Sequence, residues 1–320
     1  MKPRILLTRR WPETVEAHLQ ERYEVTCHDD GAPMSADALR QALRDHDALC
    51  PTVTDTLTAD ILSAAPRRTQ LIANYGVGYQ HIDVEACHAL GIRVTNTPDI
   101  LTEATANIAI TLMLMATRRA GEGERLLRAG RWTGWVPRQL IGTDLDGRLL
   151  GIIGFGRIGR AVAAKASRAF GMRIGWHGGR AATKELGFEA ELFPDLDALL
   201  AAADIVSIHC PGGAATHHLI NRRRLGLMKR GAFLINTARG TVVDEAALAE
   251  VLRSGAIAGA GLDVYENEPE IHRDLPSLEN VVLLPHLGSA TRDTRIAMGM
   301  RVARNLDAFF AGDEPPDAVA

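Results

Sequence analysis

Cysteine is scarce in this sequence, with four residues in 320, at positions 27, 50, 87 and 210. They form no C-x-x-C pair, and no set of cysteine and histidine has the spacing of zinc ligands. Neither a disulfide framework nor a metal site is therefore predicted. We expect four free, buried or half-buried thiols in a reducing compartment.

An excess of one charge and a long apolar run are also absent. The net charge of −3 gives no signal for nucleic acid or another polyanion. The longest apolar stretch, residues 108–116, is too short to cross a bilayer, and the apolar core at residues 5–7 is too short for a signal peptide. We expect a cytoplasmic protein without a nucleic-acid or membrane partner. Aromatic residues make up 5% of the chain, so no large aromatic cage is expected, which favours a small ligand.

The chain is long enough for two domains, and its strand and helix patterns alternate. In the first hundred residues, strands are expected at 4–8, 24–27, 48–50, 71–74 and 92–94, with helices at 12–22 and 36–44. A second series of six strands is expected at 149–153, 172–176, 204–208, 232–236, 259–262 and 281–284. The pattern predicts an α/β protein with two doubly wound parallel sheets, one in a Rossmann-type cofactor domain and one in a flavodoxin-like substrate domain.

The domain boundaries are expected near residues 98 and 290. A long helical pattern begins near Thr102, and the chain ends in a second one at 294–310. If the last helix packs against the first domain, residues 1–98 and 291–320 form a discontinuous substrate domain and residues 99–290 form the cofactor domain.

The most informative stretch runs from an apolar strand into G-x-G-x-x-G, whose glycines are Gly154, Gly156 and Gly159, and an alanine-rich helical pattern follows. In this context the motif indicates dinucleotide binding. Gly154 permits the tight turn, Gly156 lets the backbone approach a pyrophosphate, and Gly159 lets the helix pack closely on the strand. The helix N-terminus then attracts the phosphates. The alternative is an ordinary strand–turn–helix corner in a chain with 30 glycines.

The second strand of this unit lacks the acid that an NAD site places at its end to bind the ribose 2′-OH. No Asp or Glu occurs between Arg173 and Lys184, where Gly178, Gly179 and Arg180 stand instead. A guanidinium beside two glycines has the charge and the room for a 2′-phosphate, so the sequence favours NADP(H). The alternative is a solvated Arg180 and a site that also takes NAD(H).

Three chemically useful side chains, Arg239, Glu268 and His286, follow strands of the second series. Hydride transfer to a 2-oxo acid needs a planar cation for the carboxylate and the ketone, which Arg239 can supply. His286 can protonate the developing alkoxide, and Glu268 on its other ring nitrogen would fix the tautomer and favour the imidazolium. Taken singly, the arginine could pair with Asp244, the glutamate could be an exposed turn residue, and the histidine could be a loop-capping or core residue.

The chain resembles the D-isomer-specific 2-hydroxyacid dehydrogenases over nearly its whole length. The resemblance is carried by the glycine motif at 154–159, residues 236–244 (NTARGTVVD), residues 259–269 (GAGLDVYENEP) and residues 285–291 (PHLGSAT). Within the family, residues 91–106 and the pair of Trp132 and Trp135 are similar to glyoxylate/hydroxypyruvate reductases. One departure is Gly212-Gly213 after Pro211, where many relatives carry a side chain, and this leaves the adenine contacts open.

The resemblance implies roles for particular residues. Arg239, Glu268 and His286 form the catalytic trio. The backbone amides of Val77 and Gly78 meet the substrate carboxylate. Besides the glycine motif and Arg180, the cofactor contacts are expected at Thr105, Arg157, Ile158, Pro211, Thr237, Ala238, Gly288 and Asp263, the last of which meets the nicotinamide carboxamide.

The resemblance also implies a homodimer. In such reductases a tryptophan of this segment reaches the neighbouring subunit's active site, and Trp135 is the candidate here. The alternative is that Trp135 only packs in the dimer interface.

Together these expectations predict an NADP(H)-preferring reductase that converts glyoxylate, hydroxypyruvate and similar small 2-oxo acids to D-2-hydroxy acids, with His286 as the proton donor. Two alternatives stay open. One is a broader D-2-hydroxyacid dehydrogenase acting on pyruvate-sized or longer acids. The other is a non-enzymatic protein that senses NAD(P)H, as corepressors of this family do, and the intact trio argues against it.

Overall fold

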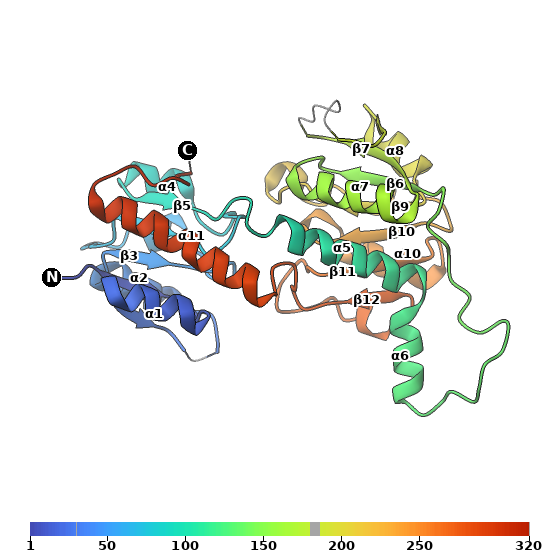
Figure 1. The fold of residues 1–320 in the computed structure, drawn as a ribbon, viewed down its shortest axis with the longest axis horizontal. Coiled ribbons are helices and arrows are strands. Elements are labelled where there is room, and N and C mark those ends of the chain that lie inside the picture. The colour runs from blue at the N-terminus through green and yellow to red at the C-terminus, as the bar shows by residue number, and fades with distance from the viewer. Residues whose placement is uncertain (30, 180–185, 320) are drawn as a thin grey trace. The chain divides into compact units, whose positions relative to one another are not determined.

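The computed structural model describes residues 1–29, 31–179 and 186–319, and the chain divides into two compact units. The first unit comprises Met1–Leu101 with Ala290–Ala320, and the second comprises Thr102–Ser289 (Figure 1). Each unit has its own parallel sheet and its own apolar cores, and each is described by itself.

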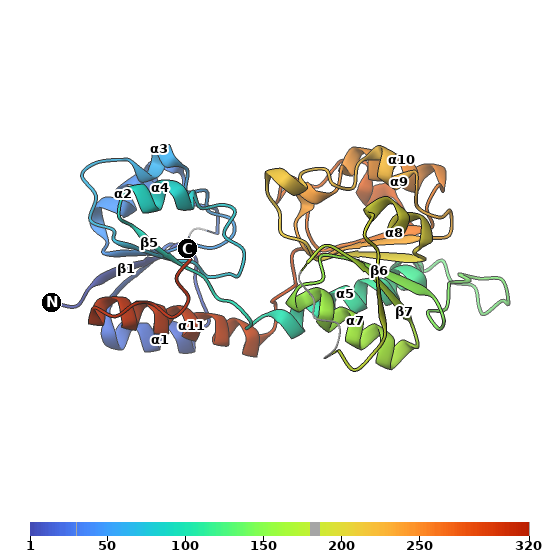
Figure 2. The same cartoon turned by 90° about the horizontal axis from the view of Figure 1, so that it is seen from above.

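In the described part of the first unit, five parallel strands lie in the order β2-β1-β3-β4-β5, which is the flavodoxin-like order. The strands are β1 (Arg4–Leu7), β2 (Glu24–Cys27), β3 (Ala48–Cys50), β4 (Leu71–Ala73) and β5 (Arg93–Thr95). The helices are α1 (Glu13–Arg22), α2 (Ala36–Asp45), α3 (Ala59–Leu62), α4 (Val84–Ala89) and α11 (Arg292–Ala311). Figure 2 shows α1 and α11 on one face of this sheet and α2, α3 and α4 on the other. Val302 and Leu306 of α11 share a buried core with Ile5 and Leu7 of β1, so the last helix belongs to this unit.

In the described part of the second unit, seven parallel strands lie in the order β12-β11-β10-β9-β6-β7-β8, which extends the Rossmann order by one strand. The strands are β6 (Leu149–Ile153), β7 (Arg173–His177), β8 (Ala190–Leu192), β9 (Ile205–Ile208), β10 (Phe233–Asn236), β11 (Gly259–Leu262) and β12 (Val281–Leu283). The α-helices are α5 (Thr102–Thr117), α6 (Ala120–Arg128), α7 (Arg157–Phe170), α8 (Leu196–Ala202), α9 (Arg222–Leu225) and α10 (Glu245–Ser254), and short 3₁₀ turns lie at Ala214–Thr216, Gly240–Val242 and Leu275–Ser277. Figure 2 shows α5 and α7 on one face and α8, α9 and α10 on the other.

The predicted fold class is confirmed, and each expected strand lies within one residue of its predicted bounds. The strand expected at 172–176 runs from Arg173 to His177, and the prediction of six strands in the second series was wrong because it omitted β8. Strands β6, β9, β10 and β11 are buried throughout and therefore read as apolar runs. β8 has three residues at the sheet edge, two of them exposed, so it carries no apolar pattern.

The prediction of free, buried or half-buried thiols is confirmed. Cys50, Cys87 and Cys210 are buried, Cys27 is half-buried, and all four are free thiols. Within the described chain, no helix combines the length and the apolar character that crossing a membrane requires.

Candidate active site

The glycine-rich turn joins β6 to α7, and at two of its positions a side chain would clash with nearby atoms. At Gly154 φ is 91°, and a Cβ would lie 2.5 Å from the amide nitrogen of Cys210. A Cβ on Gly159 would lie 2.4 Å from the carbonyl oxygen of Gly154, so the helix approaches the strand more closely than a side chain allows. A Cβ on Gly156 would meet no described atom within 4 Å. The fold therefore requires Gly154 and Gly159, whereas Gly156 leaves open space at the N-terminus of α7.

These features fit a dinucleotide cofactor. The space at Gly156 lies where the motif brings a pyrophosphate to a helix N-terminus. Thr237, directly after β10, is buried, and its hydroxyl has no partner among the described residues, so it can bond a ligand. Other expected cofactor contacts lie at the same edge of the sheet: Arg157 and Ile158 begin α7, Pro211 follows β9, and Ala238 follows Thr237.

The end of β7, where the cofactor preference is expected to be set, lies one residue later than predicted. Nδ1 of His177, the last strand residue, lies 2.9 Å from a backbone carbonyl oxygen just beyond β8. The chain then turns through Gly178 and Gly179, with φ of 71° and 111°. The Phe155 N–H donates to the Gly178 carbonyl at 2.8 Å, and a Cβ on Gly179 would lie 3.0 Å from that nitrogen. The left-handed backbone favours glycine at position 178, and close contact with Phe155 also favours it at position 179. Arg180 lies outside the described residues.

His286 and Glu268 form a hydrogen-bonded pair beyond β12 and β11. Nδ1 of His286 lies 2.7 Å from Oε2 of Glu268, whose Oε1 accepts the Tyr265 N–H at 3.0 Å. Partial burial disfavours charge on Glu268, yet the hydrogen bonds it accepts and the charges of His286 and Arg239 hold the pKa of its carboxyl below the usual value. An ionised carboxylate only accepts hydrogen bonds, so Nδ1 of His286 carries the shared proton, which leaves Nε2 for a ligand.

Arg239 lies just beyond β10 and is half-buried. Its Nη1 donates to the Ala238 carbonyl at 2.7 Å, and the Asn236 side chain braces the turn with two 3.0 Å bonds to the same two residues. Burial lowers the pKa of the guanidinium, and the charge of Glu268 opposes that shift. Asp244 accepts a backbone N–H at the start of α10, and no Arg239–Asp244 ion pair occurs in the described chain. A half-buried cation of this kind is suited to an anionic ligand.

The loop that carries His286 is held by residues expected at the cofactor. Asp263, buried after β11, accepts the N–H groups of Leu287 at 2.6 Å and Gly288 at 2.8 Å. Thr105 donates to the Gly288 carbonyl at 3.1 Å. Burial raises the pKa of Asp263, although these amides favour its charge. His286 has φ of 55°, a left-handed conformation that is costly outside glycine, so the loop depends on these bonds.

In the first unit, the turn after β4 contains the backbone expected to bind the substrate carboxylate. Nδ2 of Asn74 donates to the carbonyl oxygens of Gly76 and Gly78, at 3.0 Å each. Nδ2 of Asn96 donates to the Val77 carbonyl at 2.8 Å. No acceptor in the described chain pairs with the N–H groups of Val77 and Gly78, which leaves them available for an anion.

Residues 129–148 leave α6 as an extended segment without helix or strand, visible at the lower right of Figure 1. Of the nine large apolar side chains exposed in the described chain, five lie in or beside it: Leu127, Trp132, Trp135, Val136 and Ile141. Trp135 is 79% exposed. Such a concentration of exposed apolar side chains marks a contact surface.

Gly212, which the sequence did not identify as part of the site, lies against Arg239. A Cβ on Gly212 would be 2.8 Å from Cγ of Arg239, so the glycine sets how closely the loop after β9 approaches the guanidinium's stem. The departure from the family pattern after Pro211 was the available signal, but it pointed to the adenine contacts and not to the arginine.

Glu245, in the first turn of α10, is a second residue that the sequence did not reveal. It is buried, and its carboxylate accepts the N–H groups of Glu266 at 2.6 Å and His272 at 3.2 Å. These bonds anchor the loop that carries Glu268. A glutamate in a first helical turn is ordinary, so nothing in the sequence marked it.

The glycine-rich turn and the Arg239, Glu268 and His286 cluster can be compared with known proteins. Residues 110–288 match the profile described as D-isomer specific 2-hydroxyacid dehydrogenase, NAD binding domain. The chain belongs to this family. It is accordingly an oxidoreductase, and its second unit is a nicotinamide dinucleotide-binding domain.

Full-length relatives agree with this assignment. The chain is 46% identical to a glyoxylate reductase of Thermococcus onnurineus, over all of this chain and 96% of that one. A crystal structure from Thermus thermophilus superposes with a TM-score of 0.92 at 44% identity, covering 99% of this chain and all of the other. An NADPH-dependent glyoxylate/hydroxypyruvate reductase of Sinorhizobium meliloti, solved with NADP and malonate, gives a TM-score of 0.86 at 38% identity, covering 100% of this chain and 97% of the other.

Proposed function

We propose that this enzyme is an NADP(H)-preferring reductase that converts small 2-oxo acids, glyoxylate and hydroxypyruvate foremost, to D-2-hydroxy acids. The observation that carries the proposal is the hydrogen-bonded His286–Glu268 pair, which interacts electrostatically with Arg239 at the edge of the sheet that bears the glycine-rich turn. The names of the Thermococcus and Sinorhizobium relatives support this substrate class.

Each residue of the trio has a task in this reaction. When bound, the nicotinamide supplies the hydride that reduces C2 of the oxo acid. Arg239 binds the anionic acid and polarises its ketone through a planar fork of donors. His286 donates its Nε2 proton to the oxygen that gains charge, while Glu268 keeps the ring oriented and favours its protonated form.

We assign the first unit as the substrate domain and the second as the cofactor domain, as the boundaries expected from the sequence imply. In the first unit, the N–H groups of Val77 and Gly78 receive the substrate carboxylate. In the second, Gly154, Gly156 and Gly159 receive the pyrophosphate. Further cofactor contacts are assigned to Thr105, Arg157, Ile158, Pro211, Thr237, Ala238, Asp263 and Gly288.

The preference for NADP(H) rests on the chain after β7. Between Arg173 and Gly179 the sequence places no carboxylate that would bind a ribose 2′-OH and repel a 2′-phosphate. The Sinorhizobium relative, named NADPH-dependent and solved with NADP, supports the same preference. We assign the 2′-phosphate to Arg180, which follows these residues directly.

A homodimer is part of the proposal, with the segment at 129–148 as its contact. The exposed side chains of Trp132, Trp135 and Val136 give this segment an apolar surface that a second copy would cover. Trp135 is the residue that we assign to the neighbouring subunit's substrate site.

The proposal is tested by following oxidation of NADPH and of NADH with glyoxylate, hydroxypyruvate and pyruvate in parallel. We expect the highest kcat/KM with NADPH and either of the first two acids. Arg180→Ala should lower kcat/KM with NADPH about tenfold and leave NADH turnover unchanged, because only NADPH carries the 2′-phosphate.

Three outcomes would contradict separate parts of the proposal. A wild-type preference for NADH would refute the role of Arg180. Faster reduction of pyruvate or longer acids would favour a broader D-2-hydroxyacid dehydrogenase. Cofactor binding without turnover of any acid would favour a cofactor sensor.

A further inference from the structure

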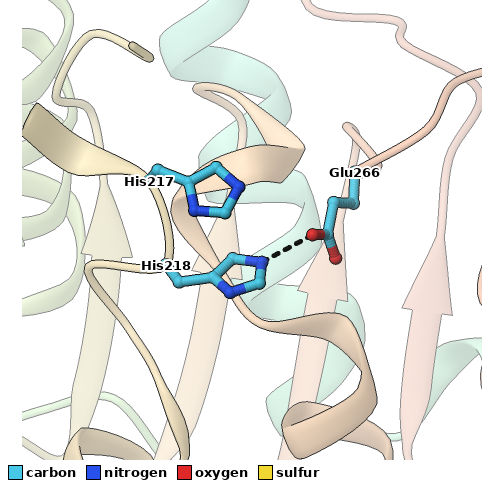
Figure 3. Close-up of side chains that lie close together, drawn as sticks. All are labelled: His217, His218 and Glu266. Atoms are coloured by element: carbon cyan, nitrogen blue, oxygen red, sulfur yellow. Dashed lines mark hydrogen bonds and ion pairs between the residues drawn. The ribbon is translucent and has the colours of Figure 1, made fainter. Parts of the chain in front are cut away.

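A second cluster of titratable side chains lies in the same unit, separate from the trio. His217 and His218 follow the 3₁₀ turn Ala214–Thr216, and Glu266 follows β11. One ligand atom from each side chain lies within 4.8 Å of the other two. Figure 3 shows the two rings stacked, with His218 directed at the carboxylate. Three potential metal ligands therefore converge from segments 48 residues apart.

We propose that His217, His218 and Glu266 bind one divalent transition-metal ion of the zinc class. The inference goes beyond the proposed reductase activity, which uses none of these three side chains. It also revises the expectation of no metal site, which considered only cysteine and local histidine spacing.

The donor set selects the class of metal. Two imidazole nitrogens and one carboxylate oxygen form a set that holds zinc in proteins with a fourth position left to water. Imidazole also suits copper, nickel and iron, whereas calcium and magnesium prefer oxygen ligands. The histidines of the cluster therefore favour zinc and its neighbours over the alkaline-earth ions.

Backbone contacts hold both sides of the cluster in place. His218 donates its N–H to the Thr241 carbonyl at 2.8 Å, and Glu245 accepts the Glu266 N–H at 2.6 Å. Between them, a Cβ on Gly240 would lie 1.8 Å from the carbonyl carbon of Tyr265, so the two backbones are in close contact. The segments that carry His218 and Glu266 are therefore already held in place before a metal ion binds.

Only small side-chain movements are needed to reach a coordination geometry. Nε2 of His218 and Oε1 of Glu266 are 2.5 Å apart, whereas two ligands of a tetrahedral zinc ion are about 3.3 Å apart. The His217 and His218 ring centroids are 4.1 Å apart, and the His217 side chain is exposed, so it can rotate toward an ion arriving from solvent. His218 has φ of 46°, and such a strained conformation is typical of a residue held for a function.

The test is a titration of the full-length chain, free of any affinity tag and treated with a chelator, with Zn²⁺ by calorimetry and with Co²⁺ by visible absorption. We expect one ion per chain and low-symmetry Co²⁺ bands. His217→Ala and Glu266→Gln should each weaken Zn²⁺ binding at least tenfold. Melting temperatures in chelator show whether each variant is folded, and the exposed His217 is the safer substitution.

Two control variants decide where a bound ion sits. His88→Ala removes an exposed histidine of the first unit and should leave Zn²⁺ affinity unchanged. His286→Ala should also leave it unchanged. Absence of stoichiometric binding would overturn the proposal, and so would an affinity that His286→Ala abolishes and His217→Ala preserves, because the ion would then belong to the His286–Glu268 pair.

Discussion

Two histidine–glutamate pairs in the second unit have nearly the same geometry. His286 and Glu268 are 2.7 Å apart, His218 and Glu266 are 2.5 Å apart, and both carboxylates come from one loop. Both histidines have left-handed backbones, with φ of 55° and 46°. The side-chain exposures are 32% and 29% in the first pair and 33% and 23% in the second. Pair geometry alone therefore does not distinguish a proton donor from a metal ligand.

The neighbours of the two pairs do differ. The charge of Arg239 and a backbone N–H both stabilise the ionised form of Glu268. The carboxylate therefore keeps a proton on the imidazole of His286. Beside Glu266 and His218 stands a second imidazole, that of His217. The neighbouring cation of Arg239 suits the His286–Glu268 pair for proton transfer. The neighbouring ring of His217 instead completes a set of metal ligands with His218 and Glu266.

The largest expected effect comes from removing His286, and removal of His218 is the matched comparison. His286→Ala should lower kcat for reduction of the 2-oxo acid by about 10²- to 10⁴-fold, because the alkoxide loses its proton donor. Steady-state kinetics at saturating NADPH, with a fluorescence titration of NADPH, should show lost turnover and retained cofactor binding. His218→Ala, assayed in chelator, should change kcat by less than about threefold. Equal losses in the two variants would show that both pairs serve the reaction.

The matched glutamates test whether charge separates the pairs. Glu268→Gln keeps the size and an acceptor but removes the charge that favours the imidazolium. We expect kcat at neutral pH to fall about tenfold or more, because the imidazolium loses the opposite charge beside it. Glu266→Gln should leave kcat within about threefold of wild type.

The same variants predict a pH dependence. In the wild type the pKa of Glu268 is held below its ordinary value, so the carboxylate keeps its charge through pH 5 and loses it only as the pH falls through that lowered value. An acid limb of the pH–rate profile above pH 5 should therefore come from another group. It should persist in Glu268→Gln, whose side chain does not titrate, and its loss in this variant would contradict the expectation.

The sequence predicted the parts of the fold and site that depend on local rules. Fully buried parallel strands are apolar throughout, so β6 and β11 were placed at their observed bounds. Parallel strands end at one edge, so the segments that follow them meet there, and His286 and Glu268 in two such segments do. The steric roles expected for Gly154 and Gly159 agree with the structure, because a turn and a close helix contact require glycine whatever the rest of the chain does.

The sequence did not predict the contacts between loops that are distant along the chain. The His218–Glu266 hydrogen bond joins positions 48 residues apart, and neither residue lies in a sequence pattern that indicates the other. The sequence connected Gly212 only with the open question of the adenine contacts, whereas its close contact is with Arg239. Such contacts follow from the paths of loops after the strands, which side-chain periodicity does not encode.

The smallest expected effect comes from Gly212→Ala. The new methyl would lie 2.8 Å from Cγ of Arg239, so the arginine must shift by a few tenths of an ångström. This shift should affect the reductase site with the His286–Glu268 pair and not the His218–Glu266 pair. We expect a KM for the 2-oxo acid about three- to tenfold higher, kcat within about threefold and unchanged Zn²⁺ affinity. Gly231→Ala, where a Cβ meets no described atom within 4 Å, is the matched control and should match wild type. If Gly212→Ala weakened Zn²⁺ binding as well, the loop from Pro211 to His218 would move as one body, and the two sites would be coupled through it.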